Sequence, residues 1–238
     1  MLFSPQIPLQ LEPRREQDFD HFVAGPNEAV LQSLRGIVDG PELQAYLWGP
    51  PSSGKTHLLN ALCLATRSRG GSAFYAGLKN LPTGSQALLD GLEQVDLLCI
   101  DDCEHAAGDA EWETALFHCI NRFRDAGRKL VLASREPLGS LPLNLPDLKS
   151  RLQWGLRLQL LALGDEQKLL VLGRYASSLG IELPEELGRY LLRRHARRLD
   201  RLIAALEQLQ QAAFVGKRRL TVPLAREVLG LTMESTDH

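Results

Sequence analysis

A complete phosphate-binding loop lies in the first quarter of the chain, and it limits the folds open to this sequence more than any other feature. Residues 49–56 read Gly-Pro-Pro-Ser-Ser-Gly-Lys-Thr and satisfy the pattern G-x-x-x-x-G-K-[ST]. An apolar, β-like run at 45–48 precedes the loop, and a helical pattern at 57–65 follows it. A Gly/Pro-rich turn is the alternative interpretation, but the strand–loop–helix order favours an α/β nucleotide-binding domain.

The residue types of this loop indicate a nucleotide and its metal ion. Gly49 and Gly54 allow the backbone to curl, so that successive N–H groups converge on phosphate oxygens at a helix N-terminus. Lys55 is expected to reach the β- and γ-phosphates, and the Thr56 hydroxyl is expected to bind Mg²⁺. We therefore expect ADP or ATP with Mg²⁺, held by Gly49, Pro50, Pro51, Ser52, Ser53, Gly54, Lys55, Thr56 and His57.

An apolar run at 97–100 that ends in two acids has the form of a Walker B motif. An unbroken apolar run suits a strand buried on both faces of a parallel sheet, so the acids at its end are expected beside the phosphate loop. Asp101 is assigned to the magnesium. Asp102 is assigned to the attacking water, although Asp is one methylene shorter than the Glu common at this position. Ser134 ends another β-like run and is either a γ-phosphate sensor or an ordinary strand-ending serine.

Composition narrows the class of protein. The 238 residues are 44% apolar, and no stretch approaches the roughly 18 uncharged apolar residues of a membrane span, so a soluble globular protein is expected. The N-terminus lacks the layout of a secretion signal, which predicts a cytoplasmic location. The four cysteines form no C-x-x-C pair and are expected to be buried apolar groups, not metal ligands or disulfides: Cys63, Cys99, Cys103 and Cys119.

Charge is distributed unevenly along the chain. The formal net charge of −2 gives no overall electrostatic reason to expect binding to DNA or to membranes. Residues 189–219 differ from the rest, because nine Lys or Arg stand there against Asp200 and Glu207. Such a patch either contacts phosphate groups or is a solvated helix face.

The order of patterns predicts three segments. Residues 1–17 contain three prolines and are expected to form a flexible arm, residues 18–162 an α/β nucleotide-binding domain, and residues 163–238 a small helical lid. Helices are expected at 27–38, 55–69, 110–125, 145–155, 165–179, 184–195, 199–214 and 224–229, with Asn27 as the first N-cap. The β-like runs at 45–48, 73–76, 97–102, 129–134 and 156–160 predict a five-stranded parallel sheet flanked by helices.

These patterns together resemble an AAA+ ATPase, and the motifs are most similar to those of the DnaA replication-initiator family over residues 19 to about 230. The similarity is carried by residues 54–59, by Ile100-Asp101-Asp102, and by the segment from Phe22 to Asn27, which implies a place for Asn27 at the nucleotide. Its most specific element is Ser150-Arg151-x-x-Trp154-Gly155. In that family this arginine is the finger inserted into the ATP site of a neighbouring subunit, so Arg151 is the implied finger. The alternative is a structural arginine paired with an acid.

Three departures from the initiators are visible. The given sequence ends soon after the lid, so the initiator's DNA-binding domain is expected to be absent. The stretch 75–101 is short and is expected to lack the extra helix with which initiators build filaments. The family's nucleotide-sensing arginine in the lid falls on Asp200, whose carboxylate would repel phosphate. The neighbouring Arg198 and Arg201 are the candidate substitutes.

The arm contains a second resemblance. Residues 6–11 read Gln-Ile-Pro-Leu-Gln-Leu, similar to the short peptide by which replication proteins dock on the bacterial sliding clamp, the β subunit of DNA polymerase III. Gln6, Ile7, Leu9 and Leu11 would be the anchors. The alternative is that these aliphatic residues pack back on the domain.

The two resemblances together imply a regulator that inactivates DnaA. It would dock on the DNA-loaded clamp, contact DNA only through that clamp, and trigger hydrolysis of DnaA-bound ATP with Arg151. Its own ATPase would be weak, and self-association is left open. An ATP-driven helicase loader that grips single-stranded DNA is the competing hypothesis, and a small-molecule kinase is a distant third.

Overall fold

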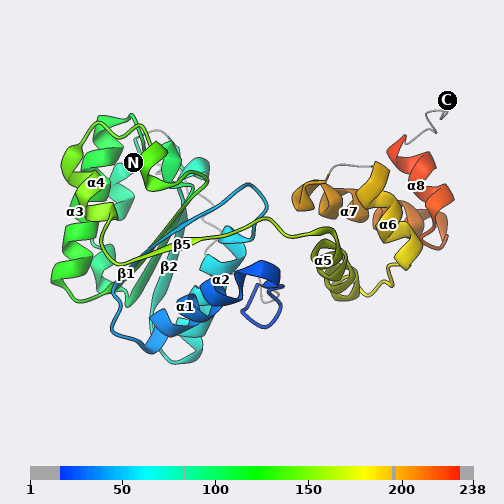
Figure 1. The fold of residues 1–238 in the computed structure, drawn as a ribbon, viewed down its shortest axis with the longest axis horizontal. Helices are drawn as coiled ribbons and strands as arrows, with labels where there is room; N and C mark the ends of the chain where they lie inside the picture. Colours follow the sequence, from blue (N-terminus) through cyan, green and yellow to red (C-terminus); the bar gives the residue numbers. More distant parts are fainter. Residues whose placement is uncertain (1–16, 83, 195–196, 231–238) are drawn as a thin grey trace, which may run out of the picture. The chain divides into compact units, whose positions relative to one another are not determined.

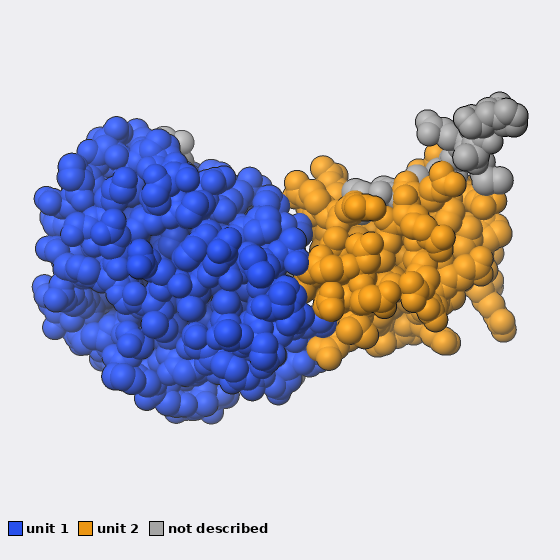
Figure 2. Space-filling view, in the orientation of Figure 1, with its two compact units in different colours: residues 1–162 blue, residues 163–238 orange. Residues whose placement is uncertain are grey.

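The computed structural model describes residues 17–82, 84–194 and 197–230. The chain divides into two compact units, residues 1–162 and 163–238, which Figure 2 shows in separate colours. The predicted clamp-binding residues Gln6, Ile7, Leu9 and Leu11 lie outside the described residues.

The first unit is built on the predicted parallel sheet. Its strands are β1 (Gln44–Trp48), β2 (Ala73–Gly77), β3 (Leu97–Asp101), β4 (Lys129–Ser134) and β5 (Leu156–Gln159). All neighbouring strands pair in parallel, in the order β2-β3-β4-β1-β5. Because β4 lies between β1 and β3, the loop after β1 and the acids at the end of β3 meet at the same edge of the sheet.

Helices cover both faces of this sheet (Figure 1). Helices α1 (Glu28–Asp39) and α2 (Lys55–Ser68) pack on one face, and α3 (Ala110–Asp125) and α4 (Pro146–Leu152) pack on the other. The alternation along β1 follows from the period of two in a strand: Ala45 and Leu47 join the core under α1 and α2, and Tyr46 joins the core under α3 and α4. Both faces are apolar, which explains the unbroken apolar strand sequences.

The side chain of Glu113 on α3 is almost completely buried and accepts hydrogen bonds from two separate backbone segments. Its two carboxylate oxygens accept hydrogen bonds from the N–H groups of Gly108 (2.8 Å), Asn144 (2.9 and 3.0 Å) and Leu145 (2.7 Å). Leu145 is the residue before α4, and Gly108 lies in the turn that follows β3. These hydrogen bonds replace the lost solvation of the buried carboxylate.

The second unit is the predicted helical lid. It consists of α5 (Asp165–Ser178), α6 (Glu185–Arg194), α7 (Leu199–Gly216) and α8 (Val222–Leu229). Leucine side chains on all four helices form its core, among them Leu172, Leu191, Leu206 and Leu224. In the part of the chain that the structure describes, neither unit has a helix that is long and apolar enough to cross a membrane.

The stretch between β2 and β3 and the start of α1 each carried an expectation from the sequence. Between β2 and β3 the described residues form only short 3-10 turns, at Leu78–Asn80, Gln86–Leu89 and Leu92–Gln94, in agreement with the expectation that no extra α-helix stands there. Asn27 does occupy the N-cap position of α1, but its side chain makes no capping hydrogen bond, so the predicted cap interaction was wrong. All four cysteines are buried and free, as expected.

Candidate functional site

The phosphate loop follows the end of β1 and is fixed by close backbone contacts. Gly49 donates its N–H to the Ser134 carbonyl at the end of β4 (3.3 Å), and Gly54 has φ +97°, a left-handed conformation that favours glycine. A Cβ added at Gly49 would lie 2.5 Å from the Leu160 carbonyl oxygen, and one at Gly54 would lie 2.6 Å from Cε2 of Phe22. Packing therefore requires a glycine at both positions, and at Gly54 the left-handed backbone conformation requires it as well.

Lys55 begins α2, and its ammonium is held inside the loop. Nζ donates to the carbonyl oxygens of Gly49 (2.7 Å) and Pro50 (3.1 Å). Burial lowers the pKa of Lys55, and the nearby carboxylate of Asp101 acts in the opposite direction. The Ser53 hydroxyl is also buried and has no hydrogen-bond partner among the described residues. A buried cation, an unpartnered hydroxyl and a glycine-lined turn together fit a phosphate group.

The two residues predicted to bind the metal lie in contact. The Thr56 hydroxyl donates to Oδ2 of Asp101 at 2.5 Å. The Tyr75 hydroxyl donates to the same oxygen at 3.1 Å, and the Asp102 N–H donates to the other carboxylate oxygen at 2.9 Å. A hydroxyl and a carboxylate are the oxygen ligands that Mg²⁺ prefers, so these residues fit the ion.

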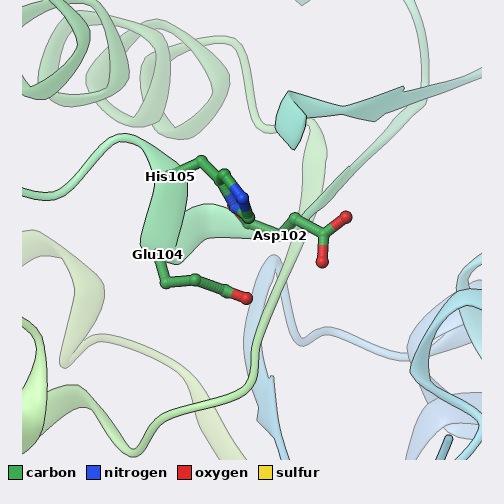
Figure 3. Close-up of side chains that lie close together, drawn as sticks. All are labelled: Asp102, Glu104 and His105. Atoms are coloured by element: carbon green, nitrogen blue, oxygen red, sulfur yellow. The ribbon is translucent and has the colours of Figure 1, made fainter. Parts of the chain in front are cut away.

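Asp102 begins the turn after β3 in a left-handed conformation, with φ +55°. Burial raises the pKa of its half-buried carboxyl group, and the neighbouring carboxylates of Asp101 and Glu104 raise it further. Asp102, Glu104 and His105 come from this one turn, and their potential ligand atoms all lie within 4.8 Å of one another (Figure 3). Nε of Arg135 lies 3.1 Å from Oε1 of Glu104, so part of this acidic charge is already compensated within the chain.

Ser134 is completely buried beside the loop. Its hydroxyl oxygen accepts a hydrogen bond from the N–H of Glu136 (3.2 Å), and its carbonyl accepts the bond from Gly49. Trp48 is its register partner on β1. The serine thus stands at the predicted edge of the sheet, while its role as a phosphate sensor stays a prediction.

Two predicted nucleotide ligands have protein partners instead. Nε2 of His57 lies 2.7 Å from the Asp18 carbonyl oxygen, and the imidazole ring stands edge-on to Phe22 with the centroids 5.4 Å apart. The Asn27 amide bonds Leu161 in both directions, donating to its carbonyl at 3.0 Å and accepting from its N–H at 2.7 Å. These contacts attach residues 18–27 to the phosphate-loop helix and to the end of the first unit, and contact of either side chain with a nucleotide stays a prediction.

Arg151 lies at the opposite edge of the sheet from the phosphate loop. Gln44, the first residue of β1, donates its side-chain amide to the carbonyl oxygens of Arg151 (2.8 Å) and Trp154 (3.2 Å). The phosphate loop begins only after the other end of β1, and at about 3.3 Å per residue the five residues of the strand separate the two by roughly 15 Å. Arg151 therefore does not reach the loop of its own chain.

The Arg151 side chain is held in place by neutral groups. Its Nε donates to Oδ1 of Asn121 (2.7 Å), and its guanidinium carbon lies 4.1 Å from the centre of the Trp154 ring and 5.6 Å from that of Phe117. Gly155 completes this motif, because a Cβ there would lie 2.0 Å from the Gln44 carbonyl oxygen. The alternative reading, a structural arginine paired with an acid, is not what the described residues show, since Arg151 has no carboxylate partner among them.

In the lid, the predicted substitutes for the missing sensor arginine differ from each other. Arg198 precedes α7 and forms a two-pronged hydrogen bond with Asp200, at 3.1 and 2.8 Å. Arg201 is exposed. The carboxylate of Asp200, at the predicted sensor position, is thus paired with Arg198, which reduces the repulsion that it would exert on phosphate.

Sequence reasoning did not find two contributors to the site. Tyr75 reaches Asp101 from β2, and Glu113 fixes the turn that follows the two acids. A tyrosine near the end of a strand was the only available signal for the first, and it becomes informative once β2 is known to pair with β3. A glutamate in an otherwise amphipathic helix gave no signal for the second.

Two regions of the chain match families of known proteins. Residues 79–159 match the family model of the bacterial DnaA ATPase domain, and residues 165–229 match that of the Hda lid domain. The chain is similar to a DnaA-related AAA+ protein with an Hda-type lid. The first match begins after the phosphate loop and includes Asp101, Asp102 and Arg151, and the second covers all four lid helices.

Solved structures share the fold at low sequence identity. Domain III of the replication initiation protein DnaA from Thermotoga maritima superposes with a TM-score of 0.81 at 22% identity, covering 95% of this chain and 100% of that one. AMPPCP-bound DnaA from Aquifex aeolicus gives 0.71 at 20% identity, covering 86% of this chain and 67% of that one. The Holliday junction branch migration motor RuvB from Thermotoga maritima gives 0.69 at 20%, covering 91% and 72%. The predicted AAA+ fold is confirmed.

Proposed function

We propose that this protein regulates DnaA by stimulating the hydrolysis of DnaA-bound ATP through Arg151 acting in trans. The observation that carries this proposal is the location of Arg151, which has no carboxylate partner among the described residues and lies at the edge of the sheet opposite to its own phosphate loop. A guanidinium placed on a γ-phosphate stabilises the charge that develops as the phosphoryl group is transferred. The matches to the DnaA ATPase domain and the Hda lid support DnaA as the partner.

The protein's own nucleotide has a separate role in this proposal. Lys55 and the loop backbone bind the phosphates of ADP or ATP, and Thr56 and Asp101 hold Mg²⁺, which when bound neutralises phosphate charge. The binding of AMPPCP to DnaA from Aquifex aeolicus supports an adenine nucleotide. Because a ligand that binds only the folded state stabilises that state, the nucleotide orders the loop and the segments attached to it.

The test uses DnaA preloaded with labelled ATP and clamp-loaded DNA. The parent chain accelerates hydrolysis, and Arg151→Ala loses roughly 10³-fold or more of that acceleration, as arginine fingers of other phosphoryl-transfer systems do. Arg157→Ala is the matched control, because Arg157 on β5 is exposed and also has no carboxylate partner among the described residues. Equal acceleration by the parent and Arg151→Ala would contradict the finger.

Clamp docking is the second part of the proposal. The arm residues Gln6, Ile7, Leu9 and Leu11 fill pockets on the sliding clamp, so the protein acts where DNA is being replicated. Replacing Gln6 and Leu9 by Ala abolishes retention on immobilised clamp. Replacing Gln10 and Leu2 by Ala, the same residue types in the same arm, leaves retention unchanged. Full retention of the Gln6/Leu9 variant removes this part of the proposal and leaves the finger untouched.

A second candidate function is an ATP-driven loader that grips single-stranded DNA. The favouring observations are that Lys55, Thr56, Asp101 and Asp102 stand together in cis, and that Lys217 and Arg219 in the lid are exposed. A DnaA structure with AMPPCP and single-stranded DNA matches this chain with a TM-score of 0.70. A loader hydrolyses its own ATP faster when DNA is added. Absence of DNA-stimulated turnover, together with acceleration of hydrolysis on DnaA, decides for the regulator.

A further inference from the structure

The ring of Trp154 is in contact with a second guanidinium besides that of Arg151. The guanidinium carbon of Arg124, near the end of α3, lies 3.8 Å from the centre of the Trp154 ring. Arg151 reaches the same ring from α4 at 4.1 Å. Two cations from different helices therefore share one indole ring at the amino edge of the sheet.

Neither of these cations is neutralised by the chain. Among the described residues, Arg124 and Arg151 form no ion pair with a carboxylate. Five of the nine arginines that the structure describes in this unit do form one, and the pairs are Arg35–Asp20, Arg69–Asp39, Arg122–Asp90, Arg128–Asp96 and Arg135–Glu104. Attraction between each cation and the indole ring offsets part of the repulsion between the two guanidiniums. An anion with more than one negative charge would offset the rest.

Space for such an anion exists beside Arg124. A hollow of about 360 Å³ opens at this edge, lined by Arg124, Trp154, Glu42 and Gln44 among others. Arg124 is exposed, so its donors are accessible to solvent. Because the phosphate loop of the same chain lies at the other edge of the sheet, a polyphosphate at this position has to belong to another molecule.

We propose that Arg124 is a second phosphate-binding cation of the trans-acting edge, and that Trp154 positions Arg124 and Arg151 together against the polyphosphate of a nucleotide held by the partner. This inference rests on the proposed function for the identity of that nucleotide. Arg151 acts on the group that is transferred, and Arg124 binds the same polyphosphate without being required for transfer. Arg124 thus supplies a charge-assisted hydrogen bond and contributes less than the finger.

The first experiment repeats the hydrolysis assay on ATP-loaded DnaA with Arg124→Ala, Arg151→Ala and the control Arg157→Ala. Arg124→Ala lowers the stimulated rate at subsaturating protein about tenfold, a typical loss for a charge-assisted hydrogen bond, and higher concentrations of the variant restore most of it. Arg157→Ala stays within about twofold of the parent. Loss with Arg151→Ala but parental behaviour of Arg124→Ala overturns the inference and leaves the proposed function intact.

The second experiment does not depend on DnaA. Inorganic tripolyphosphate is titrated into the full chain carrying Lys55→Ala, which removes the principal cation of the protein's own loop, and binding is followed by tryptophan fluorescence. Trp154→Phe identifies the part of the signal that comes from this edge. Adding Arg124→Ala weakens tripolyphosphate binding about tenfold, and adding Arg157→Ala does not. If the parent fails to stimulate hydrolysis on DnaA, the proposed function is wrong. If, in the titration, tripolyphosphate binds equally well with and without Arg124, this inference is wrong as well.

Discussion

Charged side chains have different partners at the two edges of the parallel sheet, the carboxyl edge where the strands end and the amino edge where they begin. At the carboxyl edge, the charged groups are satisfied within the chain: Lys55 donates to loop carbonyls, and Asp101 accepts from Thr56, Tyr75 and the Asp102 backbone. At the amino edge, Arg124 and Arg151 share a tryptophan and have no carboxylate partner among the described residues. In our proposal, the carboxyl edge holds a ligand of its own, and the amino edge presents donors to another molecule.

The largest expected effect separates the two edges by nucleotide affinity. Lys55→Ala removes the buried ammonium and weakens binding of a fluorescent ADP analogue by about 100-fold, since a hydrogen bond to a charged group contributes up to about 3 kcal/mol. Arg151→Ala binds the same analogue as the parent does. A comparable loss of affinity in both variants would falsify the division between the edges.

The next effect concerns the rigidity of the carboxyl edge. Gly54→Ala places a methyl group 2.6 Å from Phe22 at a residue with φ +97°, and we expect a loss of roughly 2–4 kcal/mol in the free energy of unfolding. Gly91→Ala is the control, because Gly91 has φ +77° and an added Cβ there has no neighbour within 4 Å. The difference between the two variants in urea denaturation measures the contact with Phe22, and equal losses would mean that Phe22 moves aside freely.

The smallest effect tests the electrostatic cost of this arrangement. The pKa of Asp102 is raised, so ionisation of its carboxyl group at neutral pH costs the folded state more than the unfolded state. Asp102→Asn removes that cost and is tolerated at φ +55°, so it raises stability at pH 7 by less than about 1 kcal/mol. The gain shrinks as the pH falls and disappears below the ordinary carboxyl pKa of 3.8, where the parent is protonated in both states. Thermal denaturation of the parent and of Asp102→Asn at pH 7 and pH 3.5 measures this difference in stability. A difference that is the same at both pH values would come from the backbone conformation and not from the charge.

Much of the first unit could be predicted from the sequence because its signals are local. The helix at Ala110–Asp125 and the strand at Lys129–Ser134 have the predicted bounds. Asp109 caps that helix by accepting hydrogen bonds from two backbone N–H groups, and Gly127 with φ +63° follows its end. The meeting of Thr56 with Asp101 followed from the parallel sheet, since acids at the end of a buried strand come to lie beside the loop.

The features that sequence reasoning missed depend on contacts between distant segments. Arg124 and Trp154 meet because the end of α3 packs beside the turn between α4 and β5, and no local pattern encodes that packing. Tyr75 reaches Asp101 only through the register of β2 against β3. The helix start at Asn27 was predicted correctly, but the direction of its side chain was not. The side chain bonds the backbone of Leu161 and does not cap the helix.

The buried Glu113 carboxylate has a consequence for communication across the sheet. It is bonded both to the turn after Asp102 and to the residue before α4, the helix that carries Arg151. A ligand that displaces that turn therefore alters the hydrogen bonds of Glu113, and with them the stability of the first residues of α4. Thermodynamic linkage makes the effect reciprocal: a partner that holds α4 alters nucleotide affinity at the other edge by the same factor by which the nucleotide alters affinity for the partner.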